Sequence, residues 1–241
     1  MQKNGFIRCV YGIYDNSHRL LARRQKIDTD IARIKKNEFN EPFKVYIFGK
    51  DNFERITALG FDCVLVSDDP APFDLIKHQY RNKMELIKYA LEHDFESVVY
   101  MDWDVRPKKK IEDLENFWKT FHDRGEFSAC LQYYGNIKCP WRINNETGDG
   151  RTSRHQVGNG GCVFFKSKEV INESIQCWED VDMPDNDELG YAKYVDKKMN
   201  GWKGMEYFWN KYENMFCKLR KMSAFRSDKL VEKNVYFEHY L

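Results

Sequence analysis

The sequence predicts an α/β protein with a mostly parallel central sheet and helices on both of its faces. Short apolar segments rich in β-branched and aromatic residues alternate with amphipathic segments of helical period through the first half of the chain. Parallel strands need a crossover connection, usually a helix, so this alternation favours a parallel sheet with right-handed crossovers. The 241 residues are enough for one large domain or two closely packed halves.

Composition narrows the classes of protein to consider. Lys and Arg total 39 and Asp and Glu total 38, a net charge of +1, which gives no electrostatic case for binding nucleic acid. The seven cysteines are odd in number and include no CxxC pair, which favours reduced, buried thiols over a disulfide or zinc framework. No apolar run is long enough to span a membrane and the N-terminus lacks a signal-peptide pattern, so we expect a cytoplasmic protein.

Strand-like and helix-like segments alternate over the first 93 residues. We expect strands over residues 6–11, 43–48 and 63–67, a partial helical stripe over 19–36, and a helix over 74–93. Apolar side chains recur along that last helix at spacings of three and four: Ile76, Tyr80, Met84, Ile87 and Leu91. Arg81 and Lys83 lie in its first half, where each is either solvated, paired with an acidic residue or able to reach a phosphate.

The segment around residues 97–107 organises the prediction. An apolar run over 98–101 predicts a buried strand, and it ends in Asp102-Trp103-Asp104. In an extended chain the two carboxylates point to one side and Trp103 to the other, and the carboxylates repel each other unless a cation lies between them. Oxygen ligands of this kind suit magnesium or manganese. The alternative is that one aspartate caps the next helix and the other is solvated.

The second half of the chain continues with both element types. We expect a helix over 111–122, strands over 127–131 and 158–165, a helix over 168–179, a further helix ending near 199, a helix-like aromatic stripe over 205–216 and a terminal strand over 234–241. Residues 132–157 are polar and aperiodic, and a loop of this length is usually functional or mobile. The glycines that open the strand at 158 either make a plain turn or let a ligand approach the backbone.

Four segments in this order resemble a GT-A-type glycosyltransferase: Asp102-Trp103-Asp104, Asn159-Gly160-Gly161, Asp185-Asn186-Asp187-Glu188 and His239. The resemblance covers nearly the whole chain and is greatest to retaining enzymes of the galactosyl- and xylosyltransferase family that includes galactomannan and xyloglucan enzymes. The compact form without a membrane anchor is similar to versions encoded by large algal DNA viruses. The resemblance implies a single GT-A domain over 1–241, with a nucleotide-sugar-binding half (1–107) and an acceptor-binding half (108–241).

The resemblance also implies roles for individual residues. Asp102, Asp104 and His239 would hold Mn²⁺ (or Mg²⁺) against the diphosphate of a UDP-sugar. The residues implied to contact the donor are Tyr11 (stacked on uracil), Gly12, Trp103, Asn159, Gly160 and Gly161. Because the chain ends two residues after His239 with no basic residue, Arg81 and Lys83 are the candidates for neutralising the leaving diphosphate. Asp187 and Glu188 would lie beneath the transferred sugar; relatives often have Asp-Gln there, so Glu188 is a departure, and Asp187 equally suits a helix N-cap.

The implied activity is metal-dependent transfer of a hexose or pentose from UDP-glucose, UDP-galactose or UDP-xylose to a glycan or glycoprotein acceptor, with retention of configuration. Trp141 and Trp178 are the candidate walls of the acceptor site. A phosphatase of the haloacid dehalogenase type also begins its site with a strand and Asp-x-Asp, but it requires a small hydroxyl residue shortly afterwards, and Val105-Arg106-Pro107 follows here. A sugar-nucleotide pyrophosphorylase would need a glycine-rich, basic first loop, which Gly12-Ile13-Tyr14 lacks. A non-enzymatic carbohydrate-binding protein is the remaining alternative.

Overall fold

The computed structural model describes residues 2–12, 31–34, 42–73, 79–124, 127–134, 155–179, 194, 217–220 and 236–240. Nine strands lie within these ranges: β1 (Gln2–Val10), β2 (Phe43–Phe48), β3 (Asp62–Ser67), β4 (Phe95–Met101), β5 (Val105–Pro107), β6 (Phe127–Tyr134), β7 (His155–Phe165), β8 (Cys217–Arg220) and β9 (Phe237–Tyr240). The longer helices of the same ranges are α2 (Lys50–Thr57), α3 (Gln79–His93), α4 (Leu114–Arg124) and α5 (Lys168–Glu179).

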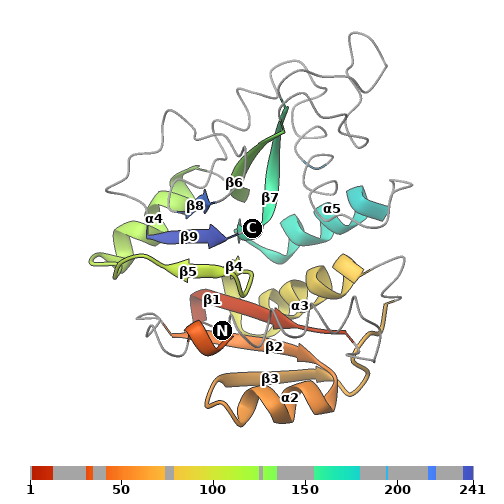
Figure 1. The fold of residues 1–241 in the computed structure, drawn as a ribbon. Coiled ribbons are helices and arrows are strands. Elements are labelled where there is room, and N and C mark those ends of the chain that lie inside the picture. Colours follow the sequence, from red (N-terminus) through yellow and green to blue (C-terminus); the bar gives the residue numbers. More distant parts are fainter. Residues whose placement is uncertain are drawn as a thin grey trace.

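The main sheet has six strands in the order β3-β2-β1-β4-β7-β6 (Figure 1). The pairs β2–β3, β1–β2 and β1–β4 are parallel, whereas β7 runs antiparallel to both β4 and β6. The predicted α/β class with a mostly parallel sheet is therefore confirmed. Because β1 and β4 are parallel neighbours, their carboxyl-terminal ends lie at the same edge of the sheet, where ligands bind in open α/β folds.

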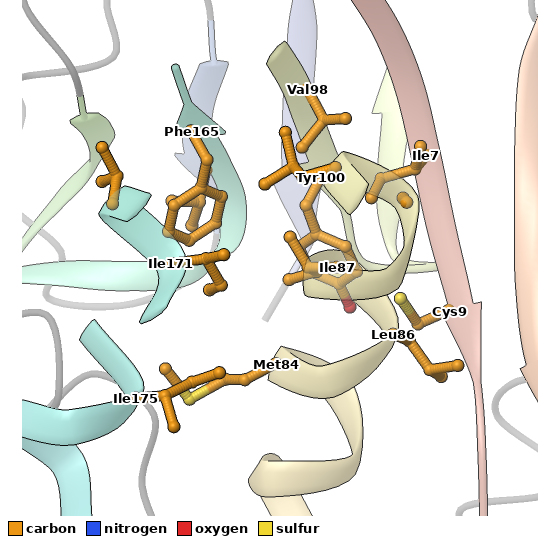
Figure 2. Close-up of a cluster of buried hydrophobic side chains, with 14 of the residues drawn as sticks. Ile7, Cys9, Met84, Leu86, Ile87, Val98, Tyr100, Phe165, Ile171 and Ile175 are labelled. Atoms are coloured by element: carbon orange, nitrogen blue, oxygen red, sulfur yellow. The ribbon is translucent and has the colours of Figure 1, made fainter. Parts of the chain in front are cut away.

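Helices cover both faces of this sheet. On one face, side chains of β1 and β4 pack with α3 and α5, and Figure 2 shows this cluster around Tyr100, with Ile7 and Cys9 of β1 and Met84 and Ile87 of α3. On the other face, the alternate residues of the same strands pack with α4 and α2. Each central strand is therefore buried on both faces, which explains why it reads as a continuous apolar run.

The structure extends or adds elements that the sequence pattern did not predict. Residues 132–134 and 155–157, expected in the long loop, pair as the outer ends of β6 and β7, with Tyr134 opposite His155. Helix α2 was not predicted because eight residues with few buried positions show no clear period. Strands β5, β9 and β8 form a second, three-stranded sheet in that order. The predicted terminal strand contributes β9, whereas β5 is only three residues long and too short to show alternation.

Several predicted segments lie outside the described residues. These are most of the stripe over 19–36, the residues around 183–189, the helix that follows them except Tyr194, and the whole aromatic stripe over 205–216. Within the described ranges, no helix combines the length and the apolar character that crossing a membrane would demand.

Candidate active site

The two aspartates lie in a tight turn directly after β4. The backbone N–H of Val105 donates to the carbonyl oxygen of Asp102 at 3.0 Å, so residues 102–105, here called the acidic turn, are not an extended continuation of the strand. The extended conformation predicted for the two aspartates is therefore wrong, and the alternation of side chains along the strand ends at Met101. Both aspartate side chains are half-buried at the carboxyl end of the sheet. The two aspartates are separated in the sequence by Trp103 alone, and the turn leaves both of their side chains partly accessible.

Trp103 turns away from the aspartates into the core. Its indole Nε1 donates to the carbonyl oxygen of Cys9 at 2.9 Å, and its ring packs edge-on against Phe43 and Phe61 with centroids 6.4 and 5.7 Å away. The side chain is only 7% exposed. It was expected among the donor contacts, and in the structure its indole anchors the acidic turn to β1.

Tyr100 orients the first aspartate. Its hydroxyl donates to Oδ1 of Asp102, and its ring is buried in the cluster beneath α3 (Figure 2). Burial raises the pKa of the Tyr100 hydroxyl well above its usual value, and the neighbouring charge of Asp102 raises it further. At neutral pH the hydroxyl therefore stays protonated and donates to the carboxylate.

The glycines of β7 meet the acidic turn. The backbone N–H of Asp102 donates to the carbonyl oxygen of Gly161 at 2.7 Å. Nζ of Lys83 donates to the carbonyl oxygen of Gly160 at 3.3 Å and lies 5.2 and 5.1 Å from the ring centroids of Tyr80 and Tyr100. The structure thus brings together four residues that the sequence pointed to separately: Lys83, Asp102, Gly160 and Gly161.

The backbone of His239 lies beside the acidic turn. In the antiparallel pairing of β5 with β9, His239 is directly opposite Val105, the residue that follows Asp104. Its side chain is outside the described set, and among the side chains that are described no group of three His, Cys, Asp or Glu lies together. The carboxylates of Asp102 and Asp104 nonetheless fit a hard divalent cation, and the strand pairing carries the backbone of the predicted third ligand to the same edge.

The end of β1 is held against the ends of β2 and β3. The backbone N–H of Gly12 donates to the carbonyl oxygen of Pro70 at 2.7 Å, and Gly12 has a φ of +100°, which a residue with a Cβ rarely adopts. Nδ2 of the buried Asn52 donates to the carbonyl oxygens of Gly12 and Phe48, at 3.2 and 2.9 Å. Tyr11 is half-buried at the same edge. Sequence analysis missed Asn52, because α2 itself was not recognised.

Arg81 is engaged elsewhere. Its guanidinium pairs with Glu85 at 2.6 Å and with Glu179, and it lies 5.2 Å from the ring centroid of Phe73. These contacts tie α3 to α5. Of the two cations expected at the diphosphate, Lys83 is the one that contacts a glycine beside the acidic turn.

The remaining predicted site residues are not placed by the structure. Trp141, Asp187 and Glu188 lie outside the described residues. Asn159 and Trp178 belong to β7 and α5, but their side chains are not described; the backbone of Asn159 pairs with Cys130.

Comparisons with known proteins identify the fold. No family model matches the chain, and no curated protein matches its sequence. Among solved structures, the apo form of mouse xyloside xylosyltransferase 1 superimposes with a TM-score of 0.52 at 12% identity, covering 98% of this chain and 97% of that one. An active-site mutant of LgtC superimposes with a TM-score of 0.51 at 14% identity, covering 98% and 86%. The chain therefore has the GT-A fold of these glycosyltransferases.

Proposed function

We propose that this protein is a metal-dependent glycosyltransferase that moves a hexose or pentose from a UDP-sugar to a glycan or glycoprotein acceptor, with retention of configuration. The single observation that carries the proposal is the acidic turn, held at the carboxyl end of β4 against the glycines of β7 within a GT-A fold. Both superimposed proteins belong to this fold, and one of them is named as a xylosyltransferase.

The cation would be held by Asp102, Asp104 and His239, with Mn²⁺ or Mg²⁺ as the ion. The oxygen-rich donor set and the half-buried position of the two aspartates support this assignment. When bound, such an ion supplies Lewis-acid stabilisation of the negative charge on a leaving diphosphate.

The chain's own residues would share the remaining work. Lys83, buried and held at the carbonyl of Gly160, places a second positive charge near the same edge. Tyr11 and Gly12 would contact the uridine, while Asn159 and the two glycines after it would line the sugar. Asp187 and Glu188 are the proposed carboxylates that stabilise the oxocarbenium-like transition state, and Trp141 and Trp178 the proposed walls of the acceptor site.

Calorimetric titration with UDP-glucose, UDP-galactose and UDP-xylose, each with Mn²⁺ and with EDTA, tests the proposal. We expect one donor to bind with Mn²⁺ and to lose its binding in EDTA. Binding of none of the three in either condition would refute the transferase assignment.

A pair of charge-neutralising variants separates this function from the alternatives. Asp104→Asn should abolish metal-dependent donor binding, whereas Asp62→Asn, at the exposed amino end of β3, should leave it unchanged. A non-enzymatic carbohydrate-binding protein would keep its affinity for sugar in both variants. A phosphatase would release phosphate from a phosphorylated substrate without any nucleotide-sugar.

A further inference from the structure

A fully buried arginine lies directly beneath the acidic turn. Arg8 is in the middle of β1 and has 0% exposure. It is on the same side of β1 as Phe6 and Val10, the face covered by α4 and α2, where its neighbours in the sheet are apolar. The apolar pattern of the sequence does not predict a buried side chain here, because a charged residue is normally expected at an exposed position.

The guanidinium of Arg8 bridges both ends of the acidic turn. One terminal nitrogen, Nη1, donates to the carbonyl oxygen of Asp102, and the other, Nη2, donates to the carbonyl oxygen of Val105 at 2.9 Å. The carbonyl of Asp102 also accepts the turn-closing bond from the N–H of Val105. Two donors in one rigid plane thus define the separation between the first and last residues of the turn.

Aromatic rings hold the guanidinium in place. Its central carbon lies 5.1 Å from the ring centroid of Phe43 and 5.2 Å from that of Trp103. Trp103 is itself part of the acidic turn and is hydrogen-bonded to β1. Arg8 therefore contacts the turn through two carbonyls and one side chain.

Arg8 remains charged, although its burial is unfavourable. Loss of solvent lowers its pKa from 12.5 to about 10, and the negative charges of Asp102 and Asp104 oppose that decrease. A buried arginine is a poor way to gain stability, since apolar side chains of similar volume often perform as well or better. Its presence in the strand is better explained by what its fork of donors does to the turn.

We propose that Arg8 is a positioning residue for the cation and donor site: it sets the backbone geometry of the acidic turn, and through Val105 the pairing that brings His239 alongside. This inference rests on the proposed function. The residue does not contact the ligand in this assignment. It acts through the carbonyls of Asp102 and Val105.

The two effects that Arg8 exerts on a bound cation have opposite signs. As a positive charge close to the two aspartates, it repels a cation, so removing its charge should tighten cation binding. As the clamp on the turn, it holds the carboxylates in register, so its removal should weaken cation binding. If positioning dominates, Arg8→Met, which keeps an apolar stem without the charge or the donors, must bind the cation less tightly than the wild type.

Electron paramagnetic resonance of Mn²⁺ measures this directly without an activity assay. Titration with Mn²⁺, alone and with UDP, reports the fraction of the ion bound to the 241-residue chain. We expect Arg8→Met to weaken Mn²⁺ binding by about 10- to 100-fold, the range seen when residues that orient metal ligands are replaced. Phe95→Leu, in the core at the opposite end of β4, controls for a general loss of stability and should bind Mn²⁺ as the wild type does.

A second variant keeps the test decisive if Arg8→Met does not fold. Arg8→Lys preserves the charge but replaces the planar fork by a single ammonium, so positioning predicts roughly three- to tenfold weaker Mn²⁺ binding. Unchanged or tighter Mn²⁺ binding in a folded Arg8 variant overturns the inference while leaving the proposed function intact. Failure of the wild type to bind Mn²⁺, with or without UDP, overturns both.

Discussion

Replacing Tyr100 by Phe tests whether the contact between its hydroxyl and Asp102 orients the proposed cation site. The substitution removes one oxygen atom from a side chain that is 2% exposed and leaves its ring in the core. The hydroxyl donates to Oδ1 of Asp102, and this carboxylate lies half-buried at the start of the acidic turn. Without that donor the carboxylate loses one of the contacts that fix its orientation.

Two independent estimates of the effect agree. A hydrogen bond to a charged group contributes about 1.5–3 kcal/mol, and each 1.4 kcal/mol corresponds to about tenfold in affinity. Replacing residues that orient metal ligands weakens metal binding by about 10- to 100-fold. The loss of stability should be smaller, ~1 kcal/mol or a decrease of roughly 2–4 °C in Tm, because water can reach the partly exposed carboxylate.

The assay pairs Tyr100→Phe with a chemically matched control. Tyr46 is also fully buried, and its hydroxyl also donates to a carboxylate, Oδ2 of Asp94, which keeps an ion pair with Lys44 at 3.5 Å. Mn²⁺ titration and calorimetry with the UDP-sugar that binds the wild type should show at least about tenfold weaker binding for Tyr100→Phe. Tyr46→Phe should lose similar stability but no affinity.

The reasoning is refuted if the two variants bind Mn²⁺ equally well. It is also refuted if the ratio of lost Mn²⁺ affinity to lost stability is the same in Tyr100→Phe as in Tyr46→Phe, because the contact with Asp102 would then support only the fold.

Three further predictions follow from the described contacts. In Gly5→Ala the new Cβ would lie 2.3 Å from a ring carbon of buried Phe95. Overpacking of this kind costs ~1–3 kcal/mol, so calorimetry should show a Tm lower by roughly 2–12 °C. A Tm within about 1 °C of the wild type would show that the ring moves aside freely. Burial first, and then the charge of Lys166, lowers the pKa of His122 from 6.5, so its contribution to stability is fully present above pH 6.5 and is lost as the pH falls through the folded-state pKa. His122→Gln should therefore flatten the decrease in Tm between pH 7.5 and 5.5, and an unchanged slope would exclude His122 as its source. Lys83→Met should weaken donor binding by roughly tenfold or more and spare Mn²⁺ binding, as measured by calorimetry; equal donor affinity would restrict Lys83 to a structural role.

Local patterns in the sequence were enough for the fold class and for the position of the acidic turn. Strand β2 and helix α5 have the predicted bounds. The order of apolar and polar residues within a short segment is enough to predict which of its side chains are buried. The abrupt change from an apolar run to Asp102 and Asp104 likewise identifies a strand end without knowledge of any partner. Short elements such as β5 escaped prediction because three residues contain too little pattern.

The tertiary structure alone decided which distant residues support that turn. Arg8 and Asp102 are 94 positions apart, and no local pattern relates a charge in the middle of β1 to a carbonyl beyond β4. The sequence predicted Trp103 on the side opposite the aspartates, but its contacts with Phe43 and Phe61 follow from the turn after Met101 and not from strand alternation. His239 acquires a neighbour at the turn only because β9 pairs with β5. A sequence records which residues are apolar or charged along the chain, whereas contacts between distant segments depend on strand order and register, which arise from the packing of the whole domain.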